Sequence, residues 1–128
     1  MLMSAITAFY RVTTKTFINE EDVSAFGSST QAKGKPSTAH HPNIERVRRA
    51  HLNDIENVFA FVLIGILYLL TNPSVDTATL HFKVFAGARF GHTIAYLIPI
   101  PQPSRFLLCA TGWVATASMA FTILSTVM

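Results

Sequence analysis

Hydrophobic and polar positions along the chain predict one long helix that begins in a charged region. Glu45–Asn57 is densely charged, and it runs without a break into the apolar residues 58–70. No Gly or Pro interrupts this stretch before Gly65. The pattern therefore predicts a helix over 44–70 that is ionic at one end and lipid-like at the other.

Two more helices are predicted after it, each preceded by a turn that contains proline. The segment 75–98 has a helical pattern but is less apolar. The segment 104–128 ends in 23 residues without any charge, and about twenty apolar residues suffice to cross a bilayer. Ser104 stands where it can cap this last helix. The sequence thus predicts three transmembrane helices over 44–70, 75–98 and 104–128.

The beginning of the chain is harder to interpret as a membrane span. Met1–Phe9 is apolar but contains only nine residues, which is too few to cross a bilayer. Residues 18–43 are rich in Gly, Ser, Pro and charge, so we expect a polar loop there. His40 and His41 in this loop lack other ligands at a suitable spacing, and we expect no metal site.

Composition favours an integral membrane protein with an all-α fold. Half of the residues are hydrophobic and 13% are charged, which is unusual for a soluble domain. The net charge of +3 does not indicate nucleic-acid binding, because seven of the ten Lys and Arg lie between Arg11 and Arg49. By the positive-inside rule, this basic region faces the cytosol. The single cysteine, Cys109, cannot form an internal disulfide.

A stripe of polar residues on the first long helix is the first candidate site. Glu45, Arg49, Asn53 and Glu56 fall within roughly one quarter of the helix circumference. An ordinary solvated helix end, with ion pairs between residues three and four apart, explains the same pattern. The charged stretch continues directly into a membrane span, and ionisable groups at that depth usually face a protein interior. This position favours a binding site over a solvated helix end. Asp54 points to the far side and is expected to lie outside the site.

A second candidate face lies on the segment 75–98. Arg89, His92, Thr93 and Tyr96 share one face at helical spacing, and Arg89 is too deep to reach the interface easily. Considered alone, His92 is better explained as a hydrogen-bonded histidine at a helix contact. With the predicted topology, this face, the ionic stripe and Arg105 reach the same cytosolic level. Such an arginine-rich pocket suits a small zwitterionic ligand with several carboxylates.

Four segments resemble the MAPEG family of small membrane proteins of eicosanoid and glutathione metabolism. They are ERVRRAHLNDIEN (45–57), FKVFAGARFGHTIAYLIPIPQPSR (82–105), TAFYRVTTKTF (7–17) and EDVSAFG (21–27). The resemblance covers nearly the whole chain and is closest to the microsomal glutathione S-transferase 1 branch. It implies a single membrane domain over 1–128, a four-helix bundle and a homotrimer. The family's first helix is longer than 1–17, so we expect this chain to begin midway through it.

The resemblance also implies an activity and a location. We expect a transferase that joins glutathione, its co-substrate, to lipophilic electrophiles arriving through the bilayer, and that also reduces lipid hydroperoxides. We expect it in the endoplasmic reticulum and also in the mitochondrial outer membrane, with the active site towards the cytosol. The rivals are a non-catalytic lipid-binding scaffold, like the family's five-lipoxygenase activating protein, and a purely structural subunit.

Roles for individual residues are carried over from the family by position. Arg105 and Tyr96 match catalytic residues, with Arg105 near the glutathione sulfur. The residues expected to bind glutathione are Arg11, Arg48, Arg49, His51, Asn53, Glu56, Arg89, His92, Tyr96 and Arg105. Two positions depart from the family. Phe106 replaces the serine of the prostaglandin E synthase branch. Val23 stands where mammalian microsomal transferases have a cysteine whose modification activates the enzyme.

Overall fold

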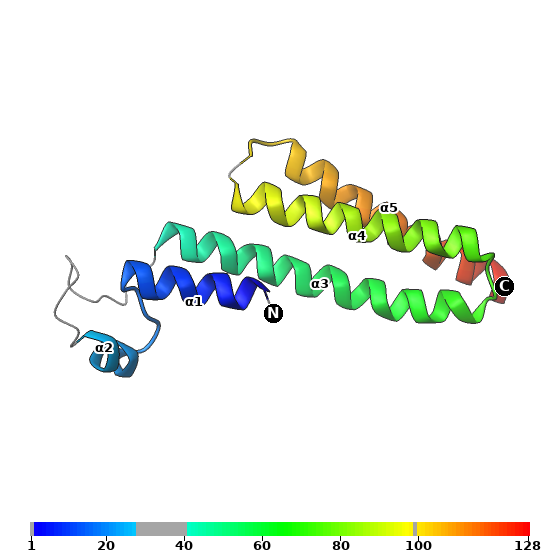
Figure 1. Ribbon diagram of the computed structural model, residues 1–128. Helices are drawn as coiled ribbons and strands as arrows, with labels where there is room; N and C mark the ends of the chain where they lie inside the picture. The colour runs from blue at the N-terminus through cyan, green and yellow to red at the C-terminus, as the bar shows by residue number, and fades with distance from the viewer. Residues whose placement is uncertain (1, 28–40, 99) are drawn as a thin grey trace. The chain divides into compact units, whose positions relative to one another are not determined.

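The computed structural model describes residues 2–27, 41–98 and 100–128, and the elements that it forms within these ranges are helices (Figure 1). This confirms the predicted all-α class. The helices are α1 Leu2–Thr14, α2 Glu20–Gly27, α3 Pro42–Leu70, α4 Val75–Leu97 and α5 Ser104–Val127. The chain forms two compact units, Met1–His51 and Leu52–Met128, so that the boundary falls within α3.

The first unit contains α1, α2 and the beginning of α3. Its buried apolar side chains come from α1, from the segment after it and from α3: Met3, Phe17, Ile44, Val47 and Ala50. Helix α2 corrects the prediction of a loop throughout 18–43. Its first turn holds Glu20, Glu21 and Asp22, and acidic side chains there stabilise the positive end of a helix. The surrounding Gly, Ser and Pro residues obscured this signal in the sequence.

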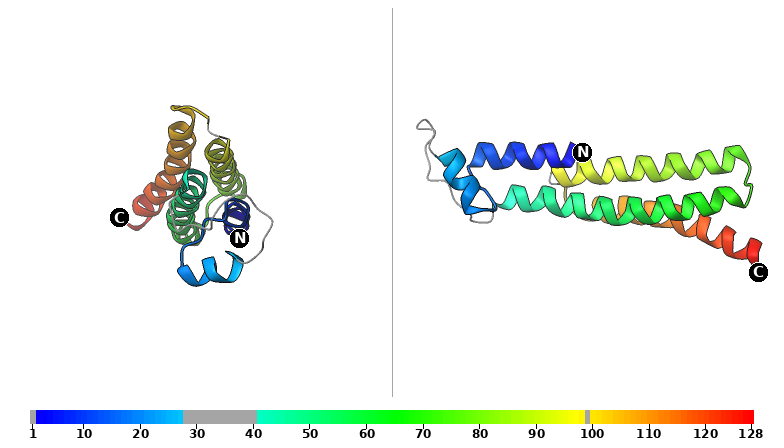
Figure 2. Two further views of the ribbon diagram at one scale, coloured as in Figure 1. Left: turned by 90° about the vertical axis from the view of Figure 1, so that its left-hand side faces the viewer. Right: turned by 90° about the horizontal axis from the view of Figure 1, so that it is seen from below.

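The second unit packs the rest of α3 against α4 and α5. Figures 1 and 2 show α4 running back alongside α3, and α5 turning back alongside α4. The core of the unit includes Phe61 and Tyr68 of α3, Phe85 of α4 and Met119 of α5. The rings of Phe61 and Phe85 are stacked, with centroids 3.7 Å apart. Aromatic and small side chains therefore join the three helices.

A short turn reverses the chain between α3 and α4. Asn72 adopts a positive φ of 59°, which asparagine tolerates better than most residues. Pro73 prevents continuation of the helix. Ser74 then caps α4, because its side chain accepts a hydrogen bond from the Thr77 backbone N–H at 3.2 Å. The direction of α4 is thus set by local sequence.

The start of α5 differs from the prediction that Ser104 caps it. The cap position is Pro103, without a side-chain cap hydrogen bond. The Ser104 hydroxyl instead donates to the Pro101 carbonyl at 2.7 Å. A proline at this position cannot donate a backbone hydrogen bond but allows the chain to enter a helix. Ser104 therefore stabilises the proline-rich turn, and Arg105 lies in the first turn of α5.

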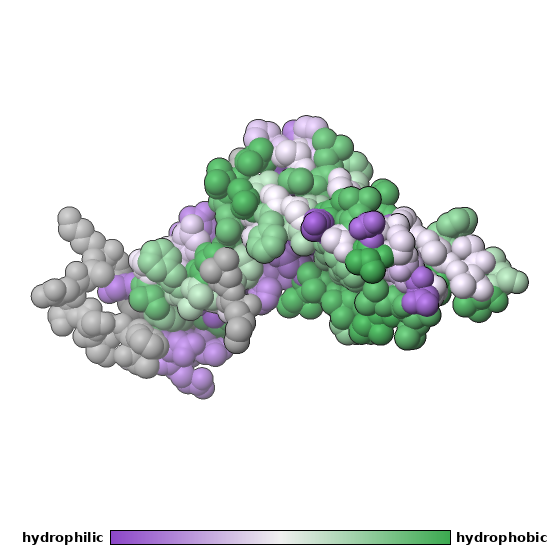
Figure 3. All heavy atoms as spheres, turned by 45° about the vertical axis from the view of Figure 1, so that its right-hand side comes forward, coloured by the Kyte–Doolittle hydropathy of each residue, from purple (hydrophilic) through white to green (hydrophobic). Residues whose placement is uncertain are grey.

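Among the described residues, α3 and α5 are long and apolar enough to cross a membrane. Helix α4 carries Asp76, Lys83 and Arg89, and its membrane crossing stays a prediction. Apolar side chains cover much of the face shown in Figure 3, with smaller hydrophilic patches among them. Within the second unit, large hydrophobic residues such as Phe59 and Phe121 are 66% and 71% exposed. This surface is typical of a protein that packs against lipid or other membrane helices.

Candidate functional site

Arg89 joins the polar part of α4 to α3. Its Nη2 donates hydrogen bonds to Asn53 Oδ1 and to Asp54 Oδ1, each at 2.6 Å. The contact with Asp54 is also an ion pair, in which 7% of the arginine side chain and 21% of the aspartate side chain are exposed. Loss of one partner of such a buried pair leaves an uncompensated charge and is strongly destabilising. The pair therefore fixes α4 against α3 at this level.

Both carboxylate oxygens of Asp54 accept hydrogen bonds from side chains of α4. Its Oδ2 accepts a hydrogen bond from Thr93 Oγ1 at 2.9 Å. Arg89 and Thr93 are four residues apart on α4 and so lie one above the other on the same helix face. An aspartate of α3 is thus held by two residues of one face of α4.

His92 extends the polar cluster along α4. Its Nδ1 lies 3.3 Å from Nη2 of Arg89, and the residue is only 3% exposed. On its other side the imidazole ring faces Tyr96, with ring centroids 5.1 Å apart. His92 therefore connects the buried ion pair with an aromatic ring one turn further along α4.

Arg105, in the first turn of α5, completes the sequence of contacts. Its guanidinium carbon lies 4.9 Å from the centre of the Tyr96 ring, a distance at which a cation is attracted to the ring face. A continuous row of contacts thus runs from Asp54 through Arg89, His92 and Tyr96 to Arg105. We call these five residues the polar row.

The two arginines of the polar row differ in how their charges are balanced. Arg89 pairs with Asp54, whereas no carboxylate of the described residues lies within ion-pair distance of Arg105. The Nε atom of Arg105 is also buried without a hydrogen-bond partner in the described part of the chain. A guanidinium in this state is suited to bind an anion, because its planar set of donors matches carboxylates and other oxyanions.

The structure brings several of the predicted site residues together. Asn53, Arg89, His92, Tyr96 and Arg105 lie in the second unit and touch one another in succession. The helical spacing of α4 was sufficient to predict its shared face. The contact with Arg105 depends on the proline-rich turn, which returns the chain to this end of α4.

The direction predicted for Asp54 is wrong, because its carboxylate contacts Arg89 together with Asn53. The prediction put it on the far side of α3 because the stripe was centred on Glu45, Arg49, Asn53 and Glu56. In the structure Asn53 and Asp54 both meet Arg89, so the side of α3 that faces α4 includes Asp54. A carboxylate next to a membrane span needs a cationic partner. From the sequence alone, this requirement could have indicated that Asp54 faces another helix.

Glu56 lies away from the polar row. The residue is exposed, and it forms no ion pair with the described residues. On α3 it is two positions after Asp54, which places the two side chains on nearly opposite sides of the helix. Its expected contact with glutathione stays a prediction.

The other predicted ligands, Arg11, Arg48, Arg49 and His51, lie in the first unit. Arg48 is exposed and pairs with Glu45 at 2.8 Å, as expected for residues three apart on a helix. Arg49 is exposed, whereas Arg11 and His51 are partly buried. Their roles as ligands stay predictions.

The polar contacts of Trp113 and Cys109 in the second unit were not predicted from the sequence. Trp113 donates from its indole Nε1 to Asn57 Oδ1 at 2.6 Å, and Asn57 in turn donates to the Asn53 backbone carbonyl at 2.8 Å. Cys109 lies beside Arg89, with 3.9 Å between Sγ and Nη1. A tryptophan in the middle of an apolar helix gave no sign of its partner, because that partner comes from another helix.

The predicted absence of a metal site concerns His40 and His41. His40 lies outside the described residues. The ring Nδ1 of His41 accepts a hydrogen bond from the Asn43 backbone N–H at 3.3 Å, which gives this side chain a local role at the start of α3.

Comparison with known proteins places the chain in a family. The model of the MAPEG family matches residues 1–125. The chain is 54% identical to microsomal glutathione S-transferase 1 of Homo sapiens over 124 residues, covering 97% of this chain and 79% of the relative. It is 53% identical to the protein of that name from Sus scrofa, with the same coverage. It is 34% identical to prostaglandin E synthase of Bos taurus, over 95% of this chain and 76% of that protein. With a match of this extent, the chain belongs to the MAPEG family.

Proposed function

We propose that this chain is a membrane-bound glutathione transferase that joins glutathione to lipophilic electrophiles. The proposal rests on the surroundings of Arg105. This cation has no carboxylate partner among the described residues, and it stacks on Tyr96 at the end of the polar row. The relatives named microsomal glutathione S-transferase 1 support it, because they are 50–54% identical to this chain.

Arg105 would act by stabilising the nucleophile. A free thiol titrates near about 8.5, and a neighbouring cation lowers the pKa of a thiol and so raises the fraction of thiolate at neutral pH. The thiolate of glutathione then attacks the electrophilic carbon. When the substrate is an aromatic halide, a carbon–sulfur bond forms, the carbon–halogen bond breaks, and halide leaves. The thiol proton passes to solvent.

The proposed glutathione ligands of the second unit are Asn53, Glu56, His92, Tyr96 and Arg105. Asn53 and Arg105 suit the carboxylates of glutathione or its sulfur, and Glu56 suits its ammonium. Arg89 belongs to the same set, although its Nη2 is already engaged with Asn53, Asp54 and His92. Arg11, Arg48, Arg49 and His51 of the first unit remain proposed ligands on the family resemblance alone.

The location and direction of the site are part of the proposal. Arg46, Arg48 and Arg49 lie at the beginning of α3, and the connection to α4 contains no Lys or Arg. By the positive-inside rule, the beginning of α3 faces the cytosol. We place the protein in the endoplasmic reticulum membrane, with the mitochondrial outer membrane as a further location. The same thiolate would reduce lipid hydroperoxides, with oxidation of two glutathione molecules to their disulfide.

A homotrimer is the proposed assembly. The exposed Glu56 and the exposed apolar residues around it on α3, such as Ile55 and Phe59, support a protein cover over this side of the helix. A carboxylate facing lipid is costly, and a second copy or a bound ligand would remove that cost. Chemical cross-linking in mild detergent should yield a ladder that ends at three copies, and a ladder that ends at one or two would contradict the proposal.

The activity is tested with the purified chain in detergent micelles. We expect product to form from glutathione and an aromatic halide faster than in protein-free micelles, and to depend on both substrates with saturation. A preparation that binds a lipophilic ligand but forms no product would instead support a non-catalytic scaffold. A folded preparation that does neither would indicate a purely structural subunit.

A further inference from the structure

A single nitrogen of Arg89 contacts three different acceptors. Its Nη2 lies 2.6 Å from Asn53 Oδ1, 2.6 Å from Asp54 Oδ1 and 3.3 Å from His92 Nδ1. A guanidinium has five N–H donors and no acceptor. Nη2 carries two of these hydrogens, so it donates one to each oxygen at 2.6 Å, and the longer contact with His92 Nδ1 shares one of them. The atoms that receive these hydrogens must be acceptors, which determines how the side chains around Nη2 are oriented.

The amide of Asn53 is oriented by this requirement. Its oxygen faces Arg89, because the reverse orientation would direct two N–H donors at a donor. The Nδ2 group then points away from Arg89 and can donate two hydrogen bonds elsewhere. Asn53 is held further by its place on α3, where its backbone carbonyl accepts a hydrogen bond from the Asn57 amide at 2.8 Å.

The imidazole of His92 is restricted in the same way. A ring nitrogen that accepts from Arg89 carries no hydrogen, so the proton of the neutral ring is on Nε2. Because His92 is 3% exposed, water does not compete with Arg89 for Nδ1. Two residues of the proposed site thus present N–H donors, Nδ2 of Asn53 and Nε2 of His92, because of one neighbouring guanidinium.

Asp54 and the packing around Arg89 hold that guanidinium in place. One oxygen of Asp54 pairs with Arg89 and the other accepts from Thr93. The aliphatic part of Arg89 passes over Gly112 of α5, where an added Cβ would lie 3.7 Å from Arg89 Cδ. The Nε atom of Arg89 is buried and has no partner among the described residues. The position of the guanidinium therefore depends on the contacts of its terminal nitrogens, of which Asp54 supplies the only charged one within the described part of the chain.

We propose that Arg89 is a positioning residue that, held by Asp54, orients Asn53 and His92 so that both offer N–H donors to glutathione. Arg89 itself then need not touch the ligand. The inference rests on the proposed glutathione transferase function and gives Arg89 a role different from the direct contact expected from the family resemblance. It also explains why a polar pair is retained at a helix contact that apolar residues could otherwise fill.

The test is a double-substitution cycle on the full chain in detergent, with Asp54→Asn, Arg89→Gln and the two combined. Each single variant leaves a polar or charged partner unbalanced, so both are expected to unfold at lower temperature. The double variant has no charge at positions 54 and 89, and we expect its thermal stability to return to near that of the parent. We expect its glutathione KM to stay raised by about tenfold, the effect of losing one or two oriented hydrogen bonds. Its KM for the electrophile should stay within about twofold of the parent.

Recovery of both stability and glutathione KM in the double variant would overturn the proposal, because the pair would then only balance charge. An unchanged glutathione KM in a folded Asp54→Asn variant would overturn it as well. Arg89→Lys keeps the charge and provides a second check. Its ammonium is closer to the main chain than Nη2, so it cannot reach Asp54, Asn53 and His92 together, and glutathione KM should again rise.

The parent chain is assayed first, so that a failure of the proposed function can be distinguished from a failure of the positioning role. If the parent forms no product with glutathione, the proposed function fails. If the parent is active and the double variant has both normal stability and normal glutathione KM, only the positioning role of Arg89 fails.

Discussion

Two arginines of the polar row have opposite electrostatic surroundings. Arg89 is 6% exposed and its charge is balanced by Asp54 at 2.6 Å. Arg105 stacks on Tyr96, and in the described part of the chain it has no carboxylate partner. A buried arginine with a partner mainly supports structure, whereas one without a partner can stabilise an incoming negative charge. The chemical role therefore stays a proposal for Arg105 and not for Arg89.

Replacing Arg105 tests this assignment by kinetics. We expect Arg105→Ala to lower kcat for conjugation of an aromatic halide by about a hundredfold or more, the usual effect of removing a preorganised group that stabilises developing charge. Glutathione KM should change much less, because other residues would hold the rest of the molecule. Arg105→Lys keeps a cation and should retain more activity than Arg105→Ala. Equal turnover in Arg105→Ala and the parent would remove Arg105 from the mechanism.

Glu56 is expected to contribute affinity without taking part in the chemistry. Glu56→Gln keeps the shape of the side chain but removes the charge proposed to meet the glutathione ammonium. If that pair is well desolvated, binding should weaken by about 2 kcal/mol, which isothermal titration in detergent can measure. Asp54 is unsuitable as a control because it pairs with Arg89. Asp76 is exposed in the first turn of α4, and Asp76→Asn should leave binding unchanged. The opposite result would show that the chosen side of α3 is wrong.

At the level of the helices, aromatic side chains hold α3 against α4. Phe61 stacks on Phe85 with centroids 3.7 Å apart and meets the edge of Phe82 at 5.4 Å. Within a bilayer, burial from water contributes little to helix contact, so packing and polar contacts must supply the stability. This applies to the Arg89–Asp54 pair as well, because it lies on the same side of α3 as Phe61, seven residues away.

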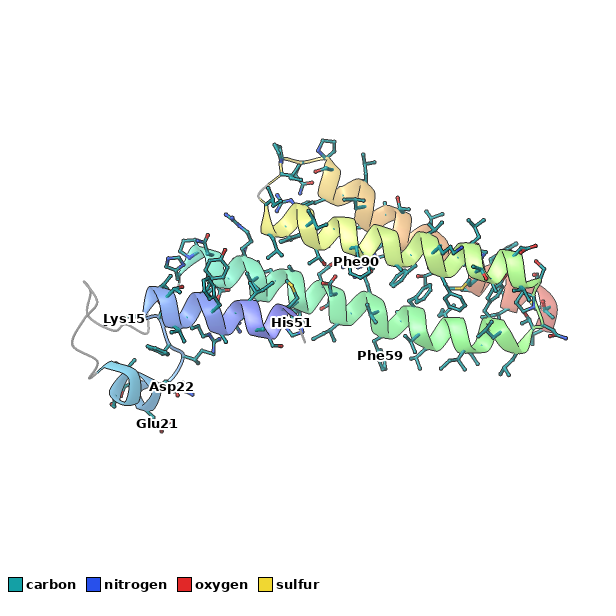
Figure 4. All side chains as sticks on the ribbon, viewed as in Figure 1. Lys15, Glu21, Asp22, His51, Phe59 and Phe90 are labelled. Atoms are coloured by element: carbon teal, nitrogen blue, oxygen red, sulfur yellow. The ribbon has the colours of Figure 1, made fainter. Side chains whose placement is uncertain are left out.

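Replacement of Phe61 tests this contribution. Phe61→Ala removes two aromatic contacts, each worth about 0.5–1.5 kcal/mol, so the free energy of unfolding should fall by about 2 kcal/mol. Denaturation in mixed detergent micelles can measure the change. Phe59 offers a matched control, because it is 66% exposed and points away from α4 (Figure 4). A loss for Phe59→Ala as large as for Phe61→Ala would contradict the packing described here.

Sequence patterns predicted the long helices better than the contacts between them. Helix α3 begins at Pro42, two residues before the predicted start at position 44, because proline suits the first turn of a helix. Helix α2 was missed because eight residues give too short a pattern among loop-forming neighbours. The pairing of Asp54 with Arg89, 35 positions apart, depends on how two helices rotate about their axes, which periodicity alone does not determine.

At the level of the whole molecule, a largely apolar exterior in the second unit surrounds a short row of polar groups. Figure 3 shows hydrophilic patches limited in extent beside apolar surface. In such surroundings an electrostatic contact is worth more than in water, because the dielectric constant is low. A lipophilic electrophile would reach the protein from the bilayer, and glutathione would reach it from the aqueous side. The proposed activity uses this difference between the two substrates.

The most direct test of this account is a glutathione titration of the detergent-solubilised chain at neutral pH, followed by the ultraviolet absorption of the thiolate. We expect a saturable thiolate band in the parent chain, and a band reduced or absent in folded Arg105→Ala that still binds glutathione. Saturable glutathione binding without a thiolate band in the parent would contradict the proposed role of Arg105. An equal band in the parent and in Arg105→Ala would contradict it in the same way.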